Sequence, residues 1–332
     1  MSVAYRGEWI VILGFLGAFI ALYTAAAFLL LRKYISPNER VPPLGNAGRL
    51  VLVLAALGLL SGAYAMFIEP FNLEITHVKV PIAGLPKAAC PIRIVQISDL
   101  HSDPTARLEP RLPDEVRKQH PDLIFFTGDA VNSAGGLDNF TNCIQAIEKI
   151  APTFCCKGDW DISPGNCSPL ERAKVNIVKN EVVTIRGAKL SIVGVDSGSD
   201  CRPAIDKAPK GMPTILLYHS PTCDVVLNND MKGIDLLCCG HTHGGQIAVP
   251  GYGALITQSK TGKRFEHGLD KLGNAWIYTN RGIGMEGHFP RVRFCAPPEL
   301  TVLELVPAAD SPGDSQEATV PALPQPSPKA VQ

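Results

Sequence analysis

The chain has 332 residues, of which 46% are hydrophobic and 19% are charged. Its 31 Lys and Arg residues balance its 31 Asp and Glu residues, so the net charge gives no reason to expect nucleic acid as a partner. The hydrophobic content excludes a mostly disordered chain, and the length suffices for one large domain or two ordinary ones.

Two stretches near the N-terminus, residues 9–31 and residues 50–68, contain no charged side chain. Each is long enough to cross the roughly 30 Å hydrocarbon core of a bilayer as a helix. We therefore predict that residues 1–68 form a membrane anchor with two transmembrane helices. The alternative for the first stretch is a cleaved signal peptide, although 23 uncharged residues exceed the usual apolar core of such a peptide.

Two signals disagree on which side of the membrane the rest of the chain lies. The segment between the two stretches carries Arg32, Lys33, Arg40 and Arg49, which predicts that this loop is cytoplasmic and that the remainder lies on the other side. All ten cysteines follow the anchor, however, and an oxidising compartment would favour disulfides. We expect an integral protein of a plasma or inner membrane and leave the side open.

After a connector at residues 69–91, with a possible strand at 73–80, apolar strands alternate with segments of helical periodicity. Strands are expected at residues 92–97, 123–126, 153–156, 182–185, 190–195, 214–218 and 235–239, and helices at 108–120, at 138–150 and between the last two strands. Short strands follow at 247–249, 275–278, 292–294 and 300–305. This order predicts an α/β domain over residues 92–307 with stacked sheets and helices outside. Residues 308–332, rich in Pro, Ala and Ser, are expected to be a disordered tail.

Polar motifs follow five of these strands at the point where each ends. They are Ser98-Asp99-Leu100-His101, Thr127-Gly128-Asp129, Lys157-Gly158-Asp159-Trp160-Asp161, His219-Ser220-Pro221 and Gly240-His241-Thr242-His243-Gly244-Gly245-Gln246. In open α/β sheets, ligands bind in the crevice beyond the carboxyl ends of the strands. We therefore expect the five motifs to meet at one site.

The residue types in these motifs indicate a metal site. An isolated Asp after a strand is usually a turn residue or a helix cap, but here Asp99, Asp129 and Asp159 occur together with four His residues. Carboxylate and neutral imidazole ligands suit Mn, Fe or Zn. Seven ligands exceed the need of one ion, so the simplest interpretation is two divalent ions that share a bridging carboxylate. The histidines His77, His120 and His267 lack such neighbours and are interpreted as surface or structural residues.

In their order, these motifs resemble the DxH, GDx, GNH, H and GHxH series of the calcineurin-like metallophosphoesterase family, over about residues 92–305. The resemblance implies a four-layer α/β/β/α sandwich. Further features resemble a membrane-associated branch that includes bacterial phosphodiesterases and a UDP-2,3-diacylglucosamine pyrophosphatase. They are Glu69-Pro70-Phe71, the Gly240 to Gln246 run, Asn280-Arg281-Gly282, and Arg291-Val292-Arg293-Phe294 leading to Pro298-Glu299-Leu300.

The same resemblance implies a role for each ligand. The first ion would be held by Asp99, His101 and His243, the second by Asp159, His219 and His241, and Asp129 would bridge the two. Manganese is the expected metal, with iron or zinc as alternatives. In this family a water between the ions, deprotonated by both, attacks phosphorus in line, and the ions stabilise the charge on the phosphoryl oxygens.

The chain departs from the family at the third motif, where Asp159-Trp160 replaces Asn-His. The missing histidine normally contacts the phosphate and assists the leaving group, and the Trp indole cannot act as an acid. This favours a substrate whose leaving group is stable as an anion, as in a pyrophosphate. Candidate donors to the leaving oxygen are Arg281 and His288, although His288 can equally be a solvated loop residue.

The sequence thus predicts a membrane-anchored hydrolase of a lipid-linked phosphodiester or pyrophosphate such as UDP-2,3-diacylglucosamine. Its partners would be the bilayer and a phosphorylated lipid or nucleotide-sugar lipid, with no nucleic acid. One alternative is an anchored phosphodiesterase of soluble or envelope substrates. The other is a catalytically impaired family member that uses its metal centre to bind a ligand, suggested by Trp160.

Overall fold

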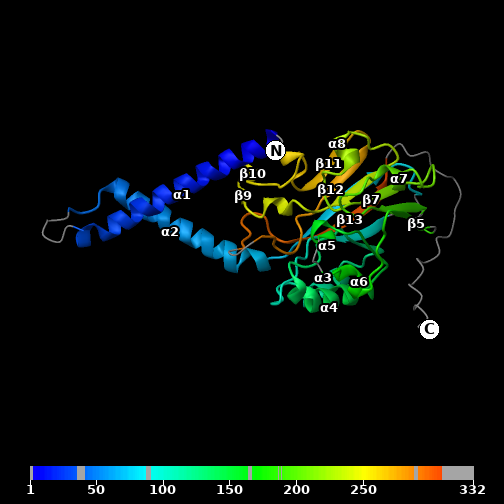
Figure 1. The fold of residues 1–332 in the computed structure, drawn as a ribbon, viewed down its shortest axis with the longest axis horizontal. Helices are drawn as coiled ribbons and strands as arrows, with labels where there is room; N and C mark the ends of the chain where they lie inside the picture. The colour runs from blue at the N-terminus through cyan, green and yellow to red at the C-terminus, as the bar shows by residue number, and fades with distance from the viewer. Residues whose placement is uncertain are drawn as a thin grey trace.

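The computed structural model describes residues 3–35, 42–86, 91–163, 167–185, 187, 189–287 and 291–308. Two long helices, α1 (Val3–Ile35) and α2 (Asn46–Phe67), project side by side from an α/β domain (Figure 1). The 3-10 turn η1 (Glu69–Phe71) follows α2 and leads into the domain. The predicted tail, from residue 309 onward, lies outside the described residues.

Both long helices are apolar and long enough to cross a membrane, a test that a core helix or a signal sequence also meets. Their large apolar side chains are mostly exposed, as at Phe15, Phe19 and Leu60, whereas a core helix would bury them. The two helices also contact each other, because the Tyr23 hydroxyl donates to the Ala55 carbonyl at 3.1 Å. The hairpin therefore presents an uncovered apolar surface.

The first sheet has five strands in the order β1 (Glu74–Ile82), β13 (Glu299–Pro307), β2 (Ile92–Ile97), β3 (Leu123–Phe126) and β4 (Thr153–Cys155). β13 is antiparallel to β2, and the other neighbours are parallel. Three helices accompany this sheet: α3 (Leu112–Lys118), α4 (Leu137–Glu148) and α6 (Pro169–Ala173).

The second sheet has six strands in the order β11 (Gly268–Leu272), β12 (Ala275–Thr279), β8 (Leu236–Cys239), β7 (Thr214–Leu217), β6 (Leu190–Gly194) and β5 (Glu181–Ile185). The outer pairs β11–β12 and β5–β6 are antiparallel, and the inner pairs are parallel. Short elements complete the domain: α5 (Asp159–Ile162), α7 (Arg202–Ile205), α8 (Asp224–Leu227), η4 (His243–Gly245), and the paired strands β9 (Ala248–Val249) and β10 (Gly253–Ala254).

The alternation of side chains along each strand stacks these elements in layers. In β2, Val95 and Ile97 pack with the helices α3, α4 and α6, whereas Ile92 and Ile94 pack with residues of the second sheet. In the second sheet, Val193, Leu216, Leu237 and Ile277 pack with α7 and α8 on the face that points away from the first sheet. The fold is therefore an α/β sandwich of two sheets, and its apolar content follows from strands buried on both faces.

Most of the predicted strands are present within one or two residues of their expected bounds. The predicted strand at 292–294 is wrong, because the structure has only an isolated bridge there, between Ile247 and Phe294. The predicted helix at 108–120 begins only at Leu112, since Pro113 suits the first turn of a helix and not its interior. Strand β11 was not predicted because Asp270 and Lys271 interrupt any apolar alternation.

Candidate metal centre

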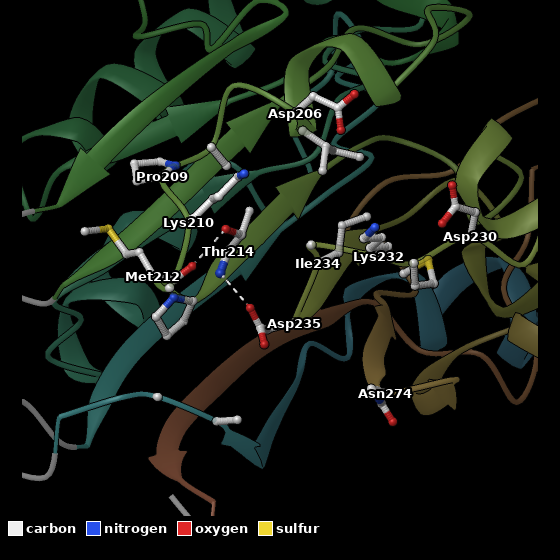
Figure 2. A pocket seen from close by; sticks show the side chains of 18 of the residues that line it. Asp206, Pro209, Lys210, Met212, Thr214, Asp230, Lys232, Ile234, Asp235 and Asn274 are labelled. Atoms are coloured by element: carbon white, nitrogen blue, oxygen red, sulfur yellow. Dashed lines mark hydrogen bonds between the residues drawn. The ribbon is translucent and has the colours of Figure 1, made fainter. Parts of the chain in front are cut away.

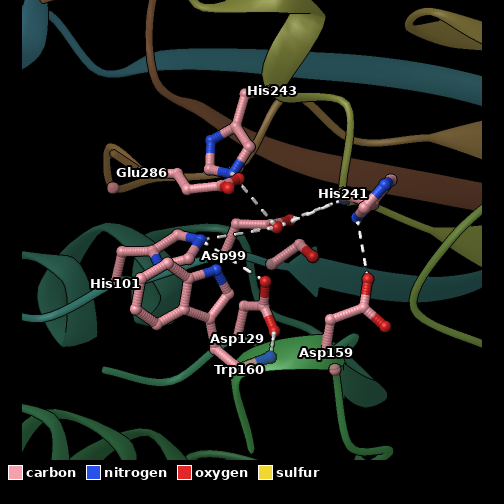
Figure 3. A network of polar contacts seen from close by, with 12 residues as sticks. Asp99, His101, Asp129, Asp159, Trp160, His241, His243 and Glu286 are labelled. Carbon is pink, nitrogen blue, oxygen red and sulfur yellow. Dashed lines mark hydrogen bonds and ion pairs between the residues drawn. The ribbon is translucent and has the colours of Figure 1, made fainter. Parts of the chain in front are cut away.

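The structure brings the seven predicted ligands together at the carboxyl ends of the strands (Figure 3). Two follow β2, one follows β3, one opens α5 after β4, one follows β7 and two follow β8. In that order they are Asp99 and His101, Asp129, Asp159, His219, and His241 and His243. Two trios of these residues each have their donor atoms within 4.8 Å of one another. A third group, formed by Asp99, Asp129 and His219, shares one residue with each trio.

The first trio is Asp99, His101 and His243, all of them buried. The His243 Nε2 atom lies 3.4 Å from Asp99 Oδ1. The His101 Nε2 atom lies 4.0 Å from the same oxygen and 3.5 Å from Asp129 Oδ2. Donor atoms at these distances from one another can all bind one ion placed between them.

The second trio is Asp159, His219 and His241. The His241 Nδ1 atom lies 3.3 Å from Asp159 Oδ2 and 3.3 Å from His219 Nε2. Asp129 Oδ2 lies 3.1 Å from that same His219 Nε2 and 3.5 Å from His101 Nε2. Asp129 is thus the carboxylate between the two trios, in the position that a bridging ligand requires.

Unpaired buried atoms test whether this set fits metal ions. Among the described residues, both ring nitrogens of His101 and the Nε2 atom of His243 are buried without a hydrogen-bond partner, which is costly unless another ligand is present. The His219 Nδ1–H group donates to the Thr127 carbonyl at 2.8 Å, so Nε2 is the nitrogen that faces the ion site. The Asp and His clusters fit a dinuclear metal site.

For three of the ligands the electrostatics favour the forms that bind metal. Burial lowers the pKa of His101 to about 4. Burial, with His101 and the Arg293 guanidinium nearby, lowers the pKa of His243 well below its usual value, so both imidazoles are neutral at pH 7. Burial alone would raise the pKa of Asp129, but the charge and hydrogen bond of His219 and the charge of His101 outweigh it and lower it to about 2. Neutral imidazole and ionised carboxylate are the ligand forms that cations need. Two other shifts run the opposite way, because burial raises the pKa of Asp99 to about 7 and, against the effect of burial, the Asp129 charge raises the pKa of His219 well above its usual value.

The ligands are held in backbone conformations that cost energy. Five of them have φ in the left-handed region: Asp99 (51°), His101 (41°), Asp129 (58°), His241 (72°) and His243 (53°). Strain of this kind costs about 1–3 kcal/mol per residue and persists where the surroundings impose it, often at functional sites. Gly240 allows the chain after β8 to lie directly against Ser98 and Asp99, because a Cβ there would lie 2.1 Å from Asp99 Oδ2 and from Ser98 Oγ.

Sequence reasoning missed two residues that support the ligands. Asp161 is buried, and its carboxylate accepts hydrogen bonds from the backbone N–H groups of Gly158, Asp129 and Ala130. Its place near the start of α5, two residues after Asp159, is the signal that could have identified it as a capping residue.

The second is Arg293, whose side chain is fully buried. Its guanidinium donates to the carbonyls of Gly284, Ala296, Arg281 and Gly282, and Nη2 lies 3.3 Å from His243 Nδ1. A buried guanidinium with this many partners fixes the loop around His243. No sequence signal distinguishes it from the neighbouring Arg291.

Trp160 occupies the place where the family has histidine. Its ring meets the His101 ring edge-on, with ring centroids 5.5 Å apart, and its indole hydrogen-bonds the Glu286 carboxylate. Glu286 was not predicted, yet its Oε2 atom lies 3.8 Å from His243 Nε2 (Figure 3). Burial and the Asp129 charge raise the pKa of Glu286.

The two predicted donors to the leaving oxygen are placed differently. The Arg281 side chain pairs with Glu74, at 2.8 Å between Nη2 and Oε2, and with Glu299, at 3.4 Å between Nε and Oε2. Both partners engage its guanidinium, and a role as donor stays a prediction. His288 lies outside the described residues.

A cavity of about 890 Å³ lies at the amino-terminal ends of strands β7 and β8 in the second sheet (Figure 2). Thr214 and Asp235, at the starts of β7 and β8, line it, whereas the metal ligands follow the ends of these strands. Arg202, which also lines it, pairs with Asp230 at 2.9 Å. The cavity is therefore separate from the metal centre.

Comparisons with known proteins agree with this fold and site. A family model described as calcineurin-like phosphoesterase matches residues 92–245. The chain is 31% identical over 271 residues to the uncharacterized metallophosphoesterase YkuE of Bacillus subtilis, covering 76% of this chain and 93% of that protein. It is 29% identical over 258 residues to the phosphodiesterase YaeI of Escherichia coli, covering 73% and 92%.

A third relative is the UDP-2,3-diacylglucosamine pyrophosphatase LpxG of Chlamydia trachomatis, 27% identical over 329 residues, covering 78% of this chain and 97% of that protein. The chain belongs to the calcineurin-like phosphoesterase family. It is a metallophosphoesterase, a metal-dependent hydrolase with a buried Asp and His site.

Proposed function

We propose that this metallophosphoesterase is anchored in a membrane and hydrolyses a lipid-linked phosphodiester or pyrophosphate such as UDP-2,3-diacylglucosamine. Two relatives support the substrate class by name, one as a phosphodiesterase and one as a pyrophosphatase of that nucleotide-sugar lipid.

The observation that carries the proposal is the closeness of the metal centre to the end of α2. The backbone N–H of Arg293 donates to the Ala65 carbonyl in the last turns of α2, at 3.1 Å, and the Arg293 side chain reaches His243. The Glu69 carboxylate accepts the Ala296 N–H at 2.6 Å, which fixes the turn after α2 to the same loop. A substrate held in the bilayer would therefore meet the site close to the membrane surface.

Exposed apolar side chains in segments next to this junction support the same substrate class. Ile247 and Tyr252, on the β9–β10 hairpin, and Phe71, in η1, expose between 38% and 47% of their surface. The hairpin pairs with the junction, because Ala248 N–H donates to the Phe294 carbonyl at 2.8 Å. Exposed apolar side chains near a membrane anchor suit contact with acyl chains.

The anchor itself is part of the proposal. We assign residues 1–68 to the anchor, 69–91 to a connector and 92–307 to the catalytic domain, in a plasma or inner membrane. The exposed apolar surface of α1 and α2 supports the interpretation that both helices span a membrane, and it argues against helices buried in a protein core. The basic residues between them favour a cytoplasmic loop.

In catalysis the Asp and His trios would hold two divalent ions, with manganese proposed from the mixed oxygen and nitrogen ligands. The ions would supply an activated water and stabilise the charge on the phosphoryl oxygens. Asp129, between the trios, would fix their separation. Trp160 leaves the leaving oxygen without the family's imidazole, which favours substrates whose leaving group is a stable anion.

Trp160 also favours a second candidate, an impaired family member that only binds its ligand. The experiment that separates the candidates uses the full chain in detergent, loaded with manganese. It compares UDP-2,3-diacylglucosamine, bis(4-nitrophenyl) phosphate and 4-nitrophenyl phosphate. Cleavage of the lipid supports the proposal. Cleavage of the soluble diester alone indicates an anchored phosphodiesterase, and two bound ions without hydrolysis indicate the impaired member.

Matched variants connect any activity to this site. His243→Ala removes a buried ligand and should lower kcat/KM by about 100-fold or more, as for removal of one charge-stabilising group. His267→Ala is the control, because the His267 side chain is half exposed and lies outside both trios. Equal losses in both variants would contradict the assignment of the site.

A further inference from the structure

A carboxylate that the ligand set does not use lies beside the first trio. The Glu286 side chain is 18% exposed, and its Oε2 atom lies 3.8 Å from His243 Nε2, the unpaired nitrogen that faces Asp99 (Figure 3). It comes from the loop after β12, whereas the other carboxylates of the site follow β2, β3 and β4. Nothing in the proposed chemistry requires a negative charge at this place.

Glu286 is held at both ends. The Gln246 side chain clamps its backbone, because Oε1 accepts the Glu286 N–H at 2.9 Å and Nε2 donates to the Glu286 carbonyl at 3.2 Å. The Trp160 indole donates to its carboxylate. The Trp160 ring in turn packs edge-on against His101. A carboxylate with a clamped backbone and a fixed donor is a positioned group and differs from a mobile loop side chain.

The charge of this carboxylate bears on which phosphate groups can approach. A phosphoryl oxygen that reaches an ion held by Asp99, His101 and His243 must come close to Glu286, because Glu286 faces the same His243 nitrogen. Repulsion between like charges grows with the charge of the ligand and is weakly screened at a largely buried site. A phosphomonoester carries two negative charges, whereas a phosphodiester carries one and a pyrophosphodiester one per phosphorus.

We propose that Glu286, held by Trp160 and Gln246, is a specificity-determining residue that makes the site prefer phosphodiester and pyrophosphodiester groups over phosphomonoesters. Trp160 thus both replaces the family's histidine and fixes an anionic group next to the ion site. The kinetic part of this inference rests on the hydrolase function proposed above.

The test is Glu286→Gln in the full, manganese-loaded chain, with kcat/KM measured at pH 8 for 4-nitrophenyl phosphate and bis(4-nitrophenyl) phosphate. The ratio of monoester to diester should rise about tenfold or more, which corresponds to about 1.4 kcal/mol. Trp160→Phe, which keeps the ring and removes the N–H, should shift the ratio in the same direction by less. Glu304→Gln is the matched control, because Glu304 pairs with Arg93 at the far end of β2.

A binding measurement keeps the inference testable without turnover. Calorimetric titration measures the affinity for inorganic phosphate and for dimethyl phosphate. The ratio of these two affinities should favour inorganic phosphate more strongly in Glu286→Gln than in the parent. An unchanged preference in both assays would overturn the inference, and so would loss of a manganese ion in Glu286→Gln, since Glu286 would then be a ligand. A parent that hydrolyses neither ester would contradict the proposed function, while the titration still decides the role of Glu286.

Discussion

The Asp161 carboxylate accepts the backbone N–H of Asp129 at 2.8 Å, so one acidic residue fixes the main chain of another. The same carboxylate accepts the N–H groups of Ala130 at 3.0 Å and Gly158 at 2.9 Å. It therefore ties the turn after β3 to the turn after β4. These two turns carry Asp129, the carboxylate between the two trios, and Asp159 of the second trio.

Asp161→Ala should destabilise the metal-free protein by about 2–4 kcal/mol, because three buried N–H groups lose their hydrogen-bond acceptor. Asp161→Asn keeps one carbonyl oxygen and should cost less. Urea unfolding followed by circular dichroism measures both. Asp114→Ala, at an exposed pair with Arg117, is the control and should stay within about 0.5 kcal/mol of the parent. Equal stability of Asp161→Ala and Asp114→Ala would contradict the role of Asp161.

The metal content should depend on Asp129. After loading with manganese and dialysis, elemental analysis should find two ions per parent chain and one or none in Asp129→Ala, because Asp129 lies between both trios. His267→Ala should retain two. A parent chain without any bound transition metal would refute the dinuclear interpretation, whatever the variants show.

The sequence predicted the site better than its surroundings, for a physical reason. Asp99 and His219 follow apolar strands of the two stacked sheets, β2 and β7, which run parallel to β3 and to β8. The ends of these strands lie on one side of the sandwich, so position along the chain predicted position in space. Glu286 and Arg293 instead lie in loops without periodicity, and their places depend on contacts with Gln246 and with α2 that no local pattern reveals. The strand at 268–272 escaped prediction for the same reason, because pairing with β12 determines it and its own alternation does not.

Manganese binding should release a proton from His219. Burial alone lowers the pKa of His219, but the charge and hydrogen bond of Asp129 and the charge of Asp99 outweigh it and raise the pKa well above its usual value. The metal-free protein therefore holds this proton at neutral pH, and a cation that binds Nε2 must displace it. Apparent affinity should rise by up to about tenfold per pH unit from pH 6 to 8. Calorimetry in two buffers of different ionisation enthalpy measures the release, and pH-independent affinity would contradict it.

Arg293 should connect the stability of the anchor junction to metal affinity. Arg293→Lys keeps the charge, but a single ammonium group cannot donate hydrogen bonds to the carbonyls of Gly284, Ala296 and Gly282 together. We therefore expect weaker manganese binding and a lower melting temperature. The size should be about 2–4 kcal/mol in unfolding free energy, since buried acceptors lose their donors. Arg117→Lys, at an exposed pair, is the control. Normal manganese affinity in a folded Arg293→Lys would show that the guanidinium does not position His243.

If α1 and α2 span a membrane as proposed, labelling of one thiol determines the side on which the catalytic domain lies. Cys295 is exposed and lies beside the anchor junction, whereas Cys201 is buried and therefore unsuited to labelling of the native protein. If the loop between the spans is cytoplasmic, as its basic residues predict, an impermeant maleimide should label Cys295 in intact cells whose outer barrier admits the reagent. Cys295→Ser is the control for labelling at the half-buried Cys167. Labelling of Cys295 only after lysis would show that the catalytic domain is cytoplasmic, and the reduced thiols would then follow from the compartment.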